Sequence, residues 1–369
     1  MLKKLLTVTT ALAIFFAANS QDSTKGTTTM TYSVDAYYRY DFAGKGNNIT
    51  SFTNSINSFE LGMASVRADH SFGKVGATLD LGFGRRAEEF SYNDGKGFAP
   101  LAGSNSMTTL AAVKQAYISY QATSKLKFTI GKWATHVGWE LLDAYANRNY
   151  SMSYGFSNGP FFHTGLKADI SLGGKSALMV GVANSTDFTT LSAGAYTPSS
   201  GIVSGNKIAI AQFSTGSKDD KVKAYLNFQG GTDAIGDKLT QEDLVLNFVL
   251  NGKWGLNYDG TIQSFKSVGG TSHSWTSNAV YLNFDPSSKL GWTLRAEYFD
   301  DKDNVRALGV GNVFAATLSA NYKVGNLTLI PELRLDNAKN EVFLKSSNST
   351  GIPDAKSAAS FILAAAYKF

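Results

Sequence analysis

Four histidines and no cysteine define the catalytic chemistry open to this chain of 369 residues. A hydrolase needs a nucleophile or an activated water beside a histidine and a carboxylate or amide. The nearest approach is a segment flanked by His136 and His163 that contains Ser151, Ser153 and Asp143. Nothing in their spacing fixes a catalytic geometry, and no HExxH pattern supports a two-histidine metal site. We therefore expect no enzymatic activity, no metal and no cofactor.

The composition favours one large, mostly β chain. It combines 36 Gly, 24 Phe and 17 Tyr with only 6 Pro, at 43% apolar and 17% charged residues. The absence of cysteine excludes disulfides and thiolate zinc sites. The formal net charge of +5 comes without a cluster of Lys and Arg, so we expect no nucleic-acid partner. The only sustained apolar run, residues 5–18, is shorter than the ~20 residues of a membrane-spanning helix.

The N-terminus has the pattern of an export signal. Lys3 and Lys4 precede an apolar stretch over residues 5–16, and a small-x-small sequence ends at Ser20. We expect a signal peptide over residues 1–20, cleaved between Ser20 and Gln21, and one mature domain over residues 21–369. The alternative is a short amphipathic or buried helix.

Beyond residue 28 the dominant hydrophobic period is two. In residues 222–229 and 290–299, for example, every second residue is apolar and the residues between are mostly polar or glycine. Such alternation is typical of strands with one apolar and one polar face. The predicted strands have about 9–12 residues, close to the length that crosses a bilayer as a tilted strand.

Short and long connections alternate between these strands. Short turns are expected at residues 72–74, 123–125, 173–175, 216–220, 251–253, 285–289 and 324–326. Long polar loops are expected at about 43–58, 87–108, 134–161, 188–206, 230–241, 266–273, 300–311 and 336–358. Fifteen connections imply about sixteen strands, in the pattern of an outer-membrane β-barrel with short periplasmic turns and long extracellular loops. Fourteen or eighteen strands would also fit.

A soluble sandwich would bury the apolar face equally well, but two features favour a closed antiparallel transmembrane β-barrel. Aromatic residues lie on the apolar face near the short turns, as in the aromatic girdle of such barrels: Tyr32, Tyr120, Trp254, Phe284, Trp292, Tyr322 and Tyr367. The chain also ends in an apolar strand, residues 361–369, which would be an aggregation hazard unless it pairs with residues 29–42. Pro331, on the apolar face of its strand, predicts a bulge or a position near the extracellular interface.

The segment after the fifth strand carries the most distinctive motifs. Gly131-Lys132, then Thr135-His136-x-Gly138-x-Glu140, Asn147-x-Asn149-Tyr150-Ser151-x-Ser153 and Pro160-x-x-His163-Thr164-Gly165 occur in this order. They resemble the OmpL-like β-barrel porin family of Gram-negative outer membranes, and the strand pattern is compatible over nearly the whole mature chain. The resemblance implies general diffusion of small solutes. Family members often have Arg where Met152 stands, so this chain would have lost a pore charge if that Arg lined the pore.

The loop over residues 134–161 allows two interpretations. It could fold into the lumen and form a constriction, with Lys132, Glu140, Asp143 and Arg148 as its charged candidates. It could instead be an extracellular loop with a short helix over residues 139–147.

Charges on the polar strand faces balance. Eight are positive (Arg39, Arg86, Lys127, Lys167, Lys223, Arg295, Arg334, Lys368) and eight are negative (Asp35, Asp41, Asp80, Asp169, Asp243, Asp259, Glu297, Glu332). We therefore expect a weakly charge-selective channel, although pairing across the wall, for example near Lys167 and Asp169, could remove many of these charges from the pore.

The sequence thus predicts an outer-membrane porin of a Gram-negative bacterium for passive diffusion of small hydrophilic solutes or ions. Its expected partners are membrane lipid, the barrel assembly machinery during biogenesis and the solutes, and it could be a homotrimer. The alternative is a barrel of low conductance that acts in surface binding or adhesion through its Ser/Thr/Asn/Gly-rich loops at 188–206 and 336–358.

Overall fold

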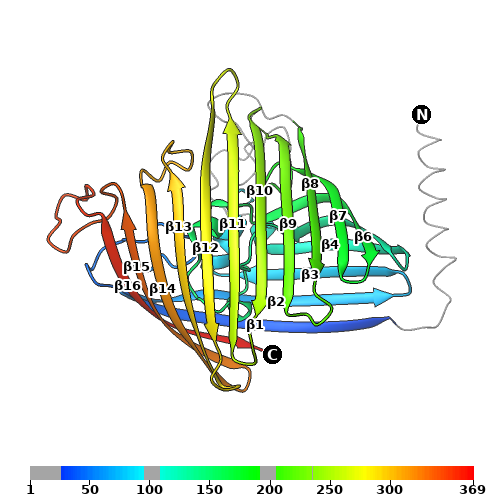
Figure 1. The fold of residues 1–369 in the computed structure, drawn as a ribbon, viewed down its shortest axis with the longest axis horizontal. Helices are drawn as coiled ribbons and strands as arrows, with labels where there is room; N and C mark the ends of the chain where they lie inside the picture. Colours follow the sequence, from blue (N-terminus) through cyan, green and yellow to red (C-terminus); the bar gives the residue numbers. More distant parts are fainter. Residues whose placement is uncertain (1–25, 95–108, 192–204, 235) are drawn as a thin grey trace.

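The computed structural model describes residues 26–94, 109–191, 205–234 and 236–369. The expected signal peptide and its cleavage between Ser20 and Gln21 lie outside these ranges. The described residues form sixteen strands that wrap into a closed barrel (Figure 1). The strands are β1 (Thr27–Asp41), β2 (Ser58–Phe72), β3 (Val75–Phe83), β4 (Val113–Thr123), β5 (Leu126–Ala134), β6 (Phe162–Gly173), β7 (Ser176–Asn184), β8 (Lys207–Gly216), β9 (Val222–Thr232), β10 (Lys238–Val249), β11 (Trp254–Lys266), β12 (Ser272–Phe284), β13 (Leu290–Asp301), β14 (Gly311–Val324), β15 (Leu327–Ala338) and β16 (Ser357–Lys368).

Each strand pairs antiparallel with its neighbours in sequence, and β16 closes the sheet against β1. Val34 lies opposite Tyr367, and the backbone amides and carbonyls of Tyr32 and Phe369 exchange two hydrogen bonds of 2.9 Å. Closure matters because a backbone N–H or C=O left unpaired in hydrocarbon costs several kcal/mol. The predicted closure and the sixteen-strand count are both confirmed.

The two faces of the wall differ as the alternation predicts. On β13, Leu294 and Tyr298 are 44% and 43% exposed on the outer face, whereas Arg295 and Glu297 between them are 0% and 2% exposed inside. The outer face is thus the apolar one that meets lipid. The girdle aromatics lie next to the short turns, where Trp254 stacks on Phe284 at 4.4 Å between ring centroids.

The short turns fall where they were predicted, but one of the expected long loops is much shorter. The β9–β10 connection spans only residues 233–237, against the expected 230–241, whereas β11–β12 spans 267–271, close to the expected 266–273. Polar residues assigned to the first of these loops continue the strands, because Gln241 faces the polar interior and pairs there with Gln263.

The helices are short and lie in connections. They are α2 (Arg85–Phe90), α3 (Tyr154–Asn158) and the 3₁₀ turns η1 (Thr109–Ala112) and η2 (Ala144–Ala146). Within the described ranges, no helix is long and apolar enough to cross a membrane.

The bulge expected at Pro331 does not form. Pro331 pairs with Leu363 of β16, and the register to β14 is the same on both sides of it, from Ser319–Glu332 to Tyr322–Leu329. It is the fifth residue of β15 after the short turn, so it does not lie near the extracellular end either. The missing N–H interrupts the ladder to β14 without shifting it, which is why no bulge is needed.

Adjacent residues on β9 test which face meets lipid. Leu226 is 56% exposed on the outer face, and Tyr225 beside it lines a cleft inside the barrel. We expect Leu226→Arg to lower the free energy of unfolding in phospholipid vesicles by about 2–4 kcal/mol, because it places a charge against hydrocarbon. The matched variant Tyr225→Arg should lower it by less than about 1 kcal/mol, since its charge meets water. Equal losses in urea titrations of the two variants would contradict this assignment of faces.

Candidate functional site

Residues 135–161, here called the lumen loop, cross the inside of the barrel. Near the start of the loop, the N–H groups of Gly138 and Trp139 donate to Asp243 (3.1 Å) on β10 and Asp259 (2.9 Å) on β11. Further along, the N–H of Tyr150 donates to Glu332 (2.8 Å) on β15. The loop therefore contacts distant parts of the wall. Of the two interpretations of this segment, the structure agrees with the loop that folds into the lumen.

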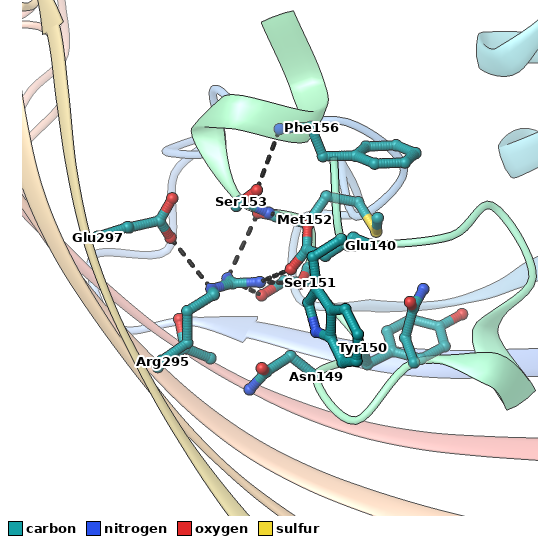
Figure 2. Close-up of polar contacts among 12 residues, drawn as sticks. Glu140, Asn149, Tyr150, Ser151, Met152, Ser153, Phe156, Arg295 and Glu297 are labelled. Carbon is teal, nitrogen blue, oxygen red and sulfur yellow. Dashed lines mark hydrogen bonds and ion pairs between the residues drawn. The ribbon is translucent and has the colours of Figure 1, made fainter. Parts of the chain in front are cut away.

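Arg295 is the central contact of the loop with the wall (Figure 2). Its guanidinium donates to the Glu140 carboxylate at 2.6 Å and to the Ser151 carbonyl at 2.7 Å, and it pairs with Glu297 at 3.2 Å. The side chain is fully buried. A buried guanidinium needs opposite charge and acceptors close by, so these partners fix the loop at this point.

The neighbouring wall charges bind the loop backbone. Glu332 also accepts from the N–H of Ser151 (3.0 Å), Glu297 accepts from the N–H of Tyr154 (2.7 Å), and Arg334 donates to the carbonyl of Met152 (2.8 Å). The Ser153 hydroxyl caps α3 by accepting from the N–H of Phe156 at 3.0 Å (Figure 2). The loop thus obtains from side chains the hydrogen bonds that an irregular backbone lacks.

A second set of cations holds the other side of the loop. Arg86 donates to the carbonyls of Leu142 (3.1 Å) and Tyr150 (3.2 Å). The Lys114 ammonium lies between Asp80 (3.1 Å) and Asp143 (2.6 Å). Sequence reasoning missed Lys114, because a register shift in the β3–β4 pairing at Asp80 turns it inward against the strand alternation.

Lys132 is also inside against the alternation set by Ile130. Gly131 has a φ of +134°, which glycine adopts readily and other residues do not, and a Cβ there would meet the carbonyl oxygen of Ala116. Beyond this irregularity the Lys132 ammonium pairs with Asp94 at 2.9 Å and lies 3.8 Å from the ring centre of Phe162. Glycine at this position thus allows the lysine to face the interior.

Most of the predicted constriction candidates are buried in these pairs. The buried ones are Lys132, Glu140, Arg39, Asp80, Arg86, Arg295, Glu297, Glu332 and Arg334. Glu140 belongs to the lumen loop, and five of the others bind it from the wall side: Arg86, Arg295, Glu297, Glu332 and Arg334. Arg39 pairs separately with Asp41 at 3.2 Å. The partly exposed candidates are Asp143, Arg148, Lys127, Lys167 and Asp169.

The exposed candidates are also paired. Asp169 lies 3.5 Å from Lys127 and 3.8 Å from Lys167, which is the wall pairing considered from the sequence. Arg148 binds Asp285 at 2.7 Å. Met152 is fully buried with its sulfur 3.4 Å from Arg86, so the position that often holds Arg in the resembled family does not line an open pore here.

The short helix over residues 139–147, part of the extracellular-loop interpretation, does not form. Only η2, three residues long, forms there. The Asn147 side chain accepts from the N–H of Leu141 and donates to its carbonyl, and the Leu142 carbonyl binds Arg86. Side chains thus take up the backbone groups that a helix would pair internally.

The two histidines of the loop region lie together, with 5.1 Å between their ring centres. His136 Nε2 is 3.0 Å from the carbonyl oxygen of Phe228, and His163 Nε2 is 3.2 Å from the Thr135 hydroxyl. Burial lowers the pKa of His136 to about 4. Across the described ranges, no three His, Cys, Asp or Glu side chains come together as metal ligands.

Two clefts lie on opposite sides of the lumen loop. One, of about 580 Å³ at the short-turn end, is lined by Trp139, Arg148, Lys223 and Lys253 among others. The other, of about 320 Å³ at the long-loop end, is lined by residues that include Asp187 and Arg306. The side chains of Gln241, Asp243 and Asp259, on the wall between the clefts, are 1–8% exposed, so the loop occupies the narrowest section.

Asp187 anchors the far end of the lumen loop and gives a pH prediction. It accepts from the N–H groups of Phe161 (2.7 Å) and Phe162 (3.0 Å), and burial raises the pKa of its carboxyl to about 6. The folded state therefore binds this proton more tightly than the unfolded state, so ionisation removes stability as pH rises from about 4 to 6, by up to about 3 kcal/mol.

We expect Asp187→Asn, which keeps the acceptor oxygen, to remove this component. The unfolding free energy of the variant minus that of wild type should rise across pH 4–6, because only wild type loses this stability, and should be constant above pH 7. The lowered pKa of His136 acts in the opposite direction over the same pH range. Because His136 is present in both proteins, its contribution cancels in the difference, which therefore isolates Asp187. A difference independent of pH would contradict the prediction.

Comparisons with known proteins agree with this architecture. The family model "Putative beta-barrel porin-2, OmpL-like" matches residues 27–369. No curated protein matches the sequence. Among solved structures, the anion-selective porin from Comamonas acidovorans has a TM-score of 0.61 at 12% identity, covering 94% of this chain and 100% of that one.

The outer membrane channel DcaP of Acinetobacter baumannii has a TM-score of 0.60 at 12% identity and covers 94% and 99% of the two chains. OmpT of Vibrio cholerae has a TM-score of 0.54 at 11% identity, with 94% and 99% covered. These likenesses show a shared fold. The family match covers almost the whole described chain and shows that this protein belongs to the OmpL-like β-barrel porin family.

Proposed function

We propose that this protein is a passive, non-enzymatic channel for small hydrophilic solutes or ions in the outer membrane of a Gram-negative bacterium. The observation that carries the proposal is a closed barrel with a polar interior, narrowed by the lumen loop to a short buried section between two clefts. Barrels of this type conduct when water-filled space connects their two ends.

The proposed path runs along the β9–β12 side of the lumen loop. Its wall is rich in amides, including Gln229, Gln241 and Gln263, which are hydrogen-bonded in a row. In the buried section between the clefts, two hydrogen bonds join this stretch of loop to the wall, from Gly138 to Asp243 on β10 and from Trp139 to Asp259 on β11. Solutes would pass when the loop moves away from these carboxylates.

Weak charge selectivity is part of the proposal. The strongest charges near the loop are neutralised locally, as with Arg295 between Glu140 and Glu297. In the cleft at the short-turn end, Arg148 is paired with Asp285. Among the described residues, Lys223 and Lys253 in this cleft form no ion pair within 4 Å, a small positive surplus that gives at most a mild preference for anions.

The quaternary state is proposed by analogy. One of the similar structures, at 10% identity, is a trimer form of OmpT from Vibrio cholerae. A homotrimer is thus our expectation for this chain, and mass determination in detergent would test it.

Planar-bilayer recording of the purified, refolded protein tests the channel. We expect discrete conductance steps and an anion-to-cation permeability ratio below about ten. Arg295→Met should raise the conductance or its fluctuations, because it leaves Glu140 without an ion-pair partner and Glu297 with Arg334 alone. Loss of a buried partner of this kind loosens the loop by about 3–5 kcal/mol. The control Lys302→Met, which removes an exposed charge in the β13–β14 connection, should match wild type.

Two outcomes would contradict the proposal. A correctly folded barrel in lipid without conductance steps would favour the alternative role in surface binding or adhesion. A permeability ratio well above ten would show that unpaired charges control the passage and that the selectivity assignment is wrong.

A further inference from the structure

The outer wall carries a cleft of about 610 Å³ that the channel function does not use. Its floor is a row of three residues that lie side by side on β14, β15 and β16: Ala316 opposite Leu335, and Leu335 opposite Ala359. All three alternate with inward-facing residues, so the cleft opens on the face that meets lipid. Small residues at both sides of Leu335 make the wall hollow there.

Two aromatic rings form the sides of this cleft, which we call the lipid-side furrow. Phe314 on β14 and Phe42 just after β1 are 54% and 55% exposed. The N–H of Phe42 donates to the carbonyl of Ala359 at 3.1 Å, which places Phe42 at the β16 edge of the floor. The depression between the two rings, with small residues on either side of Leu335, offers an apolar surface against which an extended hydrocarbon chain can pack.

The furrow becomes polar at its long-loop end. Asn337 and Ser357 line it one step beyond Leu335 and Ala359, and the Ser357 hydroxyl donates to the Asn337 side-chain oxygen at 3.1 Å. Ser346, from the β15–β16 connection, also lines this end. An amphipathic occupant, apolar below and polar above, fits this gradient.

The β15–β16 connection above the furrow, the red loop in Figure 1, is fixed in place. Phe343 is buried and bridges to Ala355, and the Lys45 ammonium donates to the carbonyl of Asn348 at 2.7 Å. The upper edge of the furrow is therefore preformed and needs little ordering when it is occupied.

Charge around this end is positive. Lys345 and Lys356 directly adjoin the lining residues Ser346 and Ser357 in sequence, and both are exposed. The β15–β16 connection contains three lysines and two acids, and Lys45 adds a fourth positive charge. The residues counted are Lys45, Lys339, Lys345 and Lys356 against Glu341 and Asp354. A net charge of about +2 at the membrane surface attracts lipid phosphate, each lysine contributing about a tenfold or smaller gain.

We propose that the lipid-side furrow binds an anionic, phosphate-bearing membrane lipid, with one acyl chain between Phe314 and Phe42 and the phosphate near Lys345 and Lys356. Lipid is the favoured occupant because the furrow opens into the bilayer and its polar end is cationic. A second copy docked through this same face would instead bring like-charged lysines together.

Native mass spectrometry of the intact barrel released from detergent tests the proposal, with phosphatidylglycerol and phosphatidylcholine as probes. We expect wild type to retain phosphatidylglycerol in preference to phosphatidylcholine. Ala316→Phe combined with Ala359→Phe fills the floor and should lower the retained fraction by about tenfold or more. Lys345→Gln combined with Lys356→Gln should abolish the preference for phosphatidylglycerol while leaving some binding of both lipids.

The matched control is Ala209→Phe, which adds the same ring to an exposed, lipid-facing position near the long-loop end of β8. It should retain phosphatidylglycerol like wild type, and all variants should keep the compact, unheated gel mobility of a folded barrel. Equal retention in the furrow-filled variant and the control would overturn the proposal. Loss of an oligomer rather than of lipid in the filled variant would also overturn it, and would make the furrow a contact between copies.

Discussion

Hydrogen bonding of an irregular backbone inside a membrane barrel is the constraint on which this structure depends. The lumen loop runs through the barrel with only a three-residue turn and a five-residue helix of its own. Its amides and carbonyls are removed from bulk water and need partners. Carboxylates from β10, β11, β13 and β15 accept from the loop, and guanidinium groups from β13 and β15 donate to it.

This arrangement explains why the interior carries so many charges and yet so little net charge. A wall carboxylate that accepts two loop N–H groups, as Glu332 does, is stabilised by them and needs no mobile counter-ion. A guanidinium such as Arg295 then neutralises the neighbouring carboxylates Glu140 and Glu297. The charges hold the loop, and the passage that we propose beside it is bordered largely by amides. In this proposal the same residues restrict the lumen and keep the charge selectivity weak.

Local sequence patterns predicted the wall well because the outer and inner faces of each strand meet different solvents. The alternation, the short turns and the closure of the last strand on the first all follow from that difference. The strands β9 and β10 were predicted too short at their long-loop ends, because lumen-facing residues such as Gln241 are as polar as loop residues. Lys114 and Lys132 departed from the expected alternation, at a register shift and at Gly131, which only the pairing of neighbouring strands reveals.

The position of the loop could not be predicted from local pattern, since its partners lie up to 183 residues away, as between Arg334 and Ser151. Its motifs carried the family resemblance, but the charge tally treated buried pairs and exposed charges alike. Arg295 and Glu140 were named as separate pore candidates, and the structure joins them in one buried contact. Long-range pairing of this kind depends on the register of sixteen strands together.

Hydrogen–deuterium exchange of the folded protein in lipid tests the central claim most directly. If wall carboxylates hold the lumen loop, the amides of Tyr150, Ser151 and Tyr154 should exchange as slowly as those of the strands, and far more slowly than amides in the exposed connection at Lys302. Exchange of these three amides at the rate of the exposed connection would show that the loop is not fixed in the lumen.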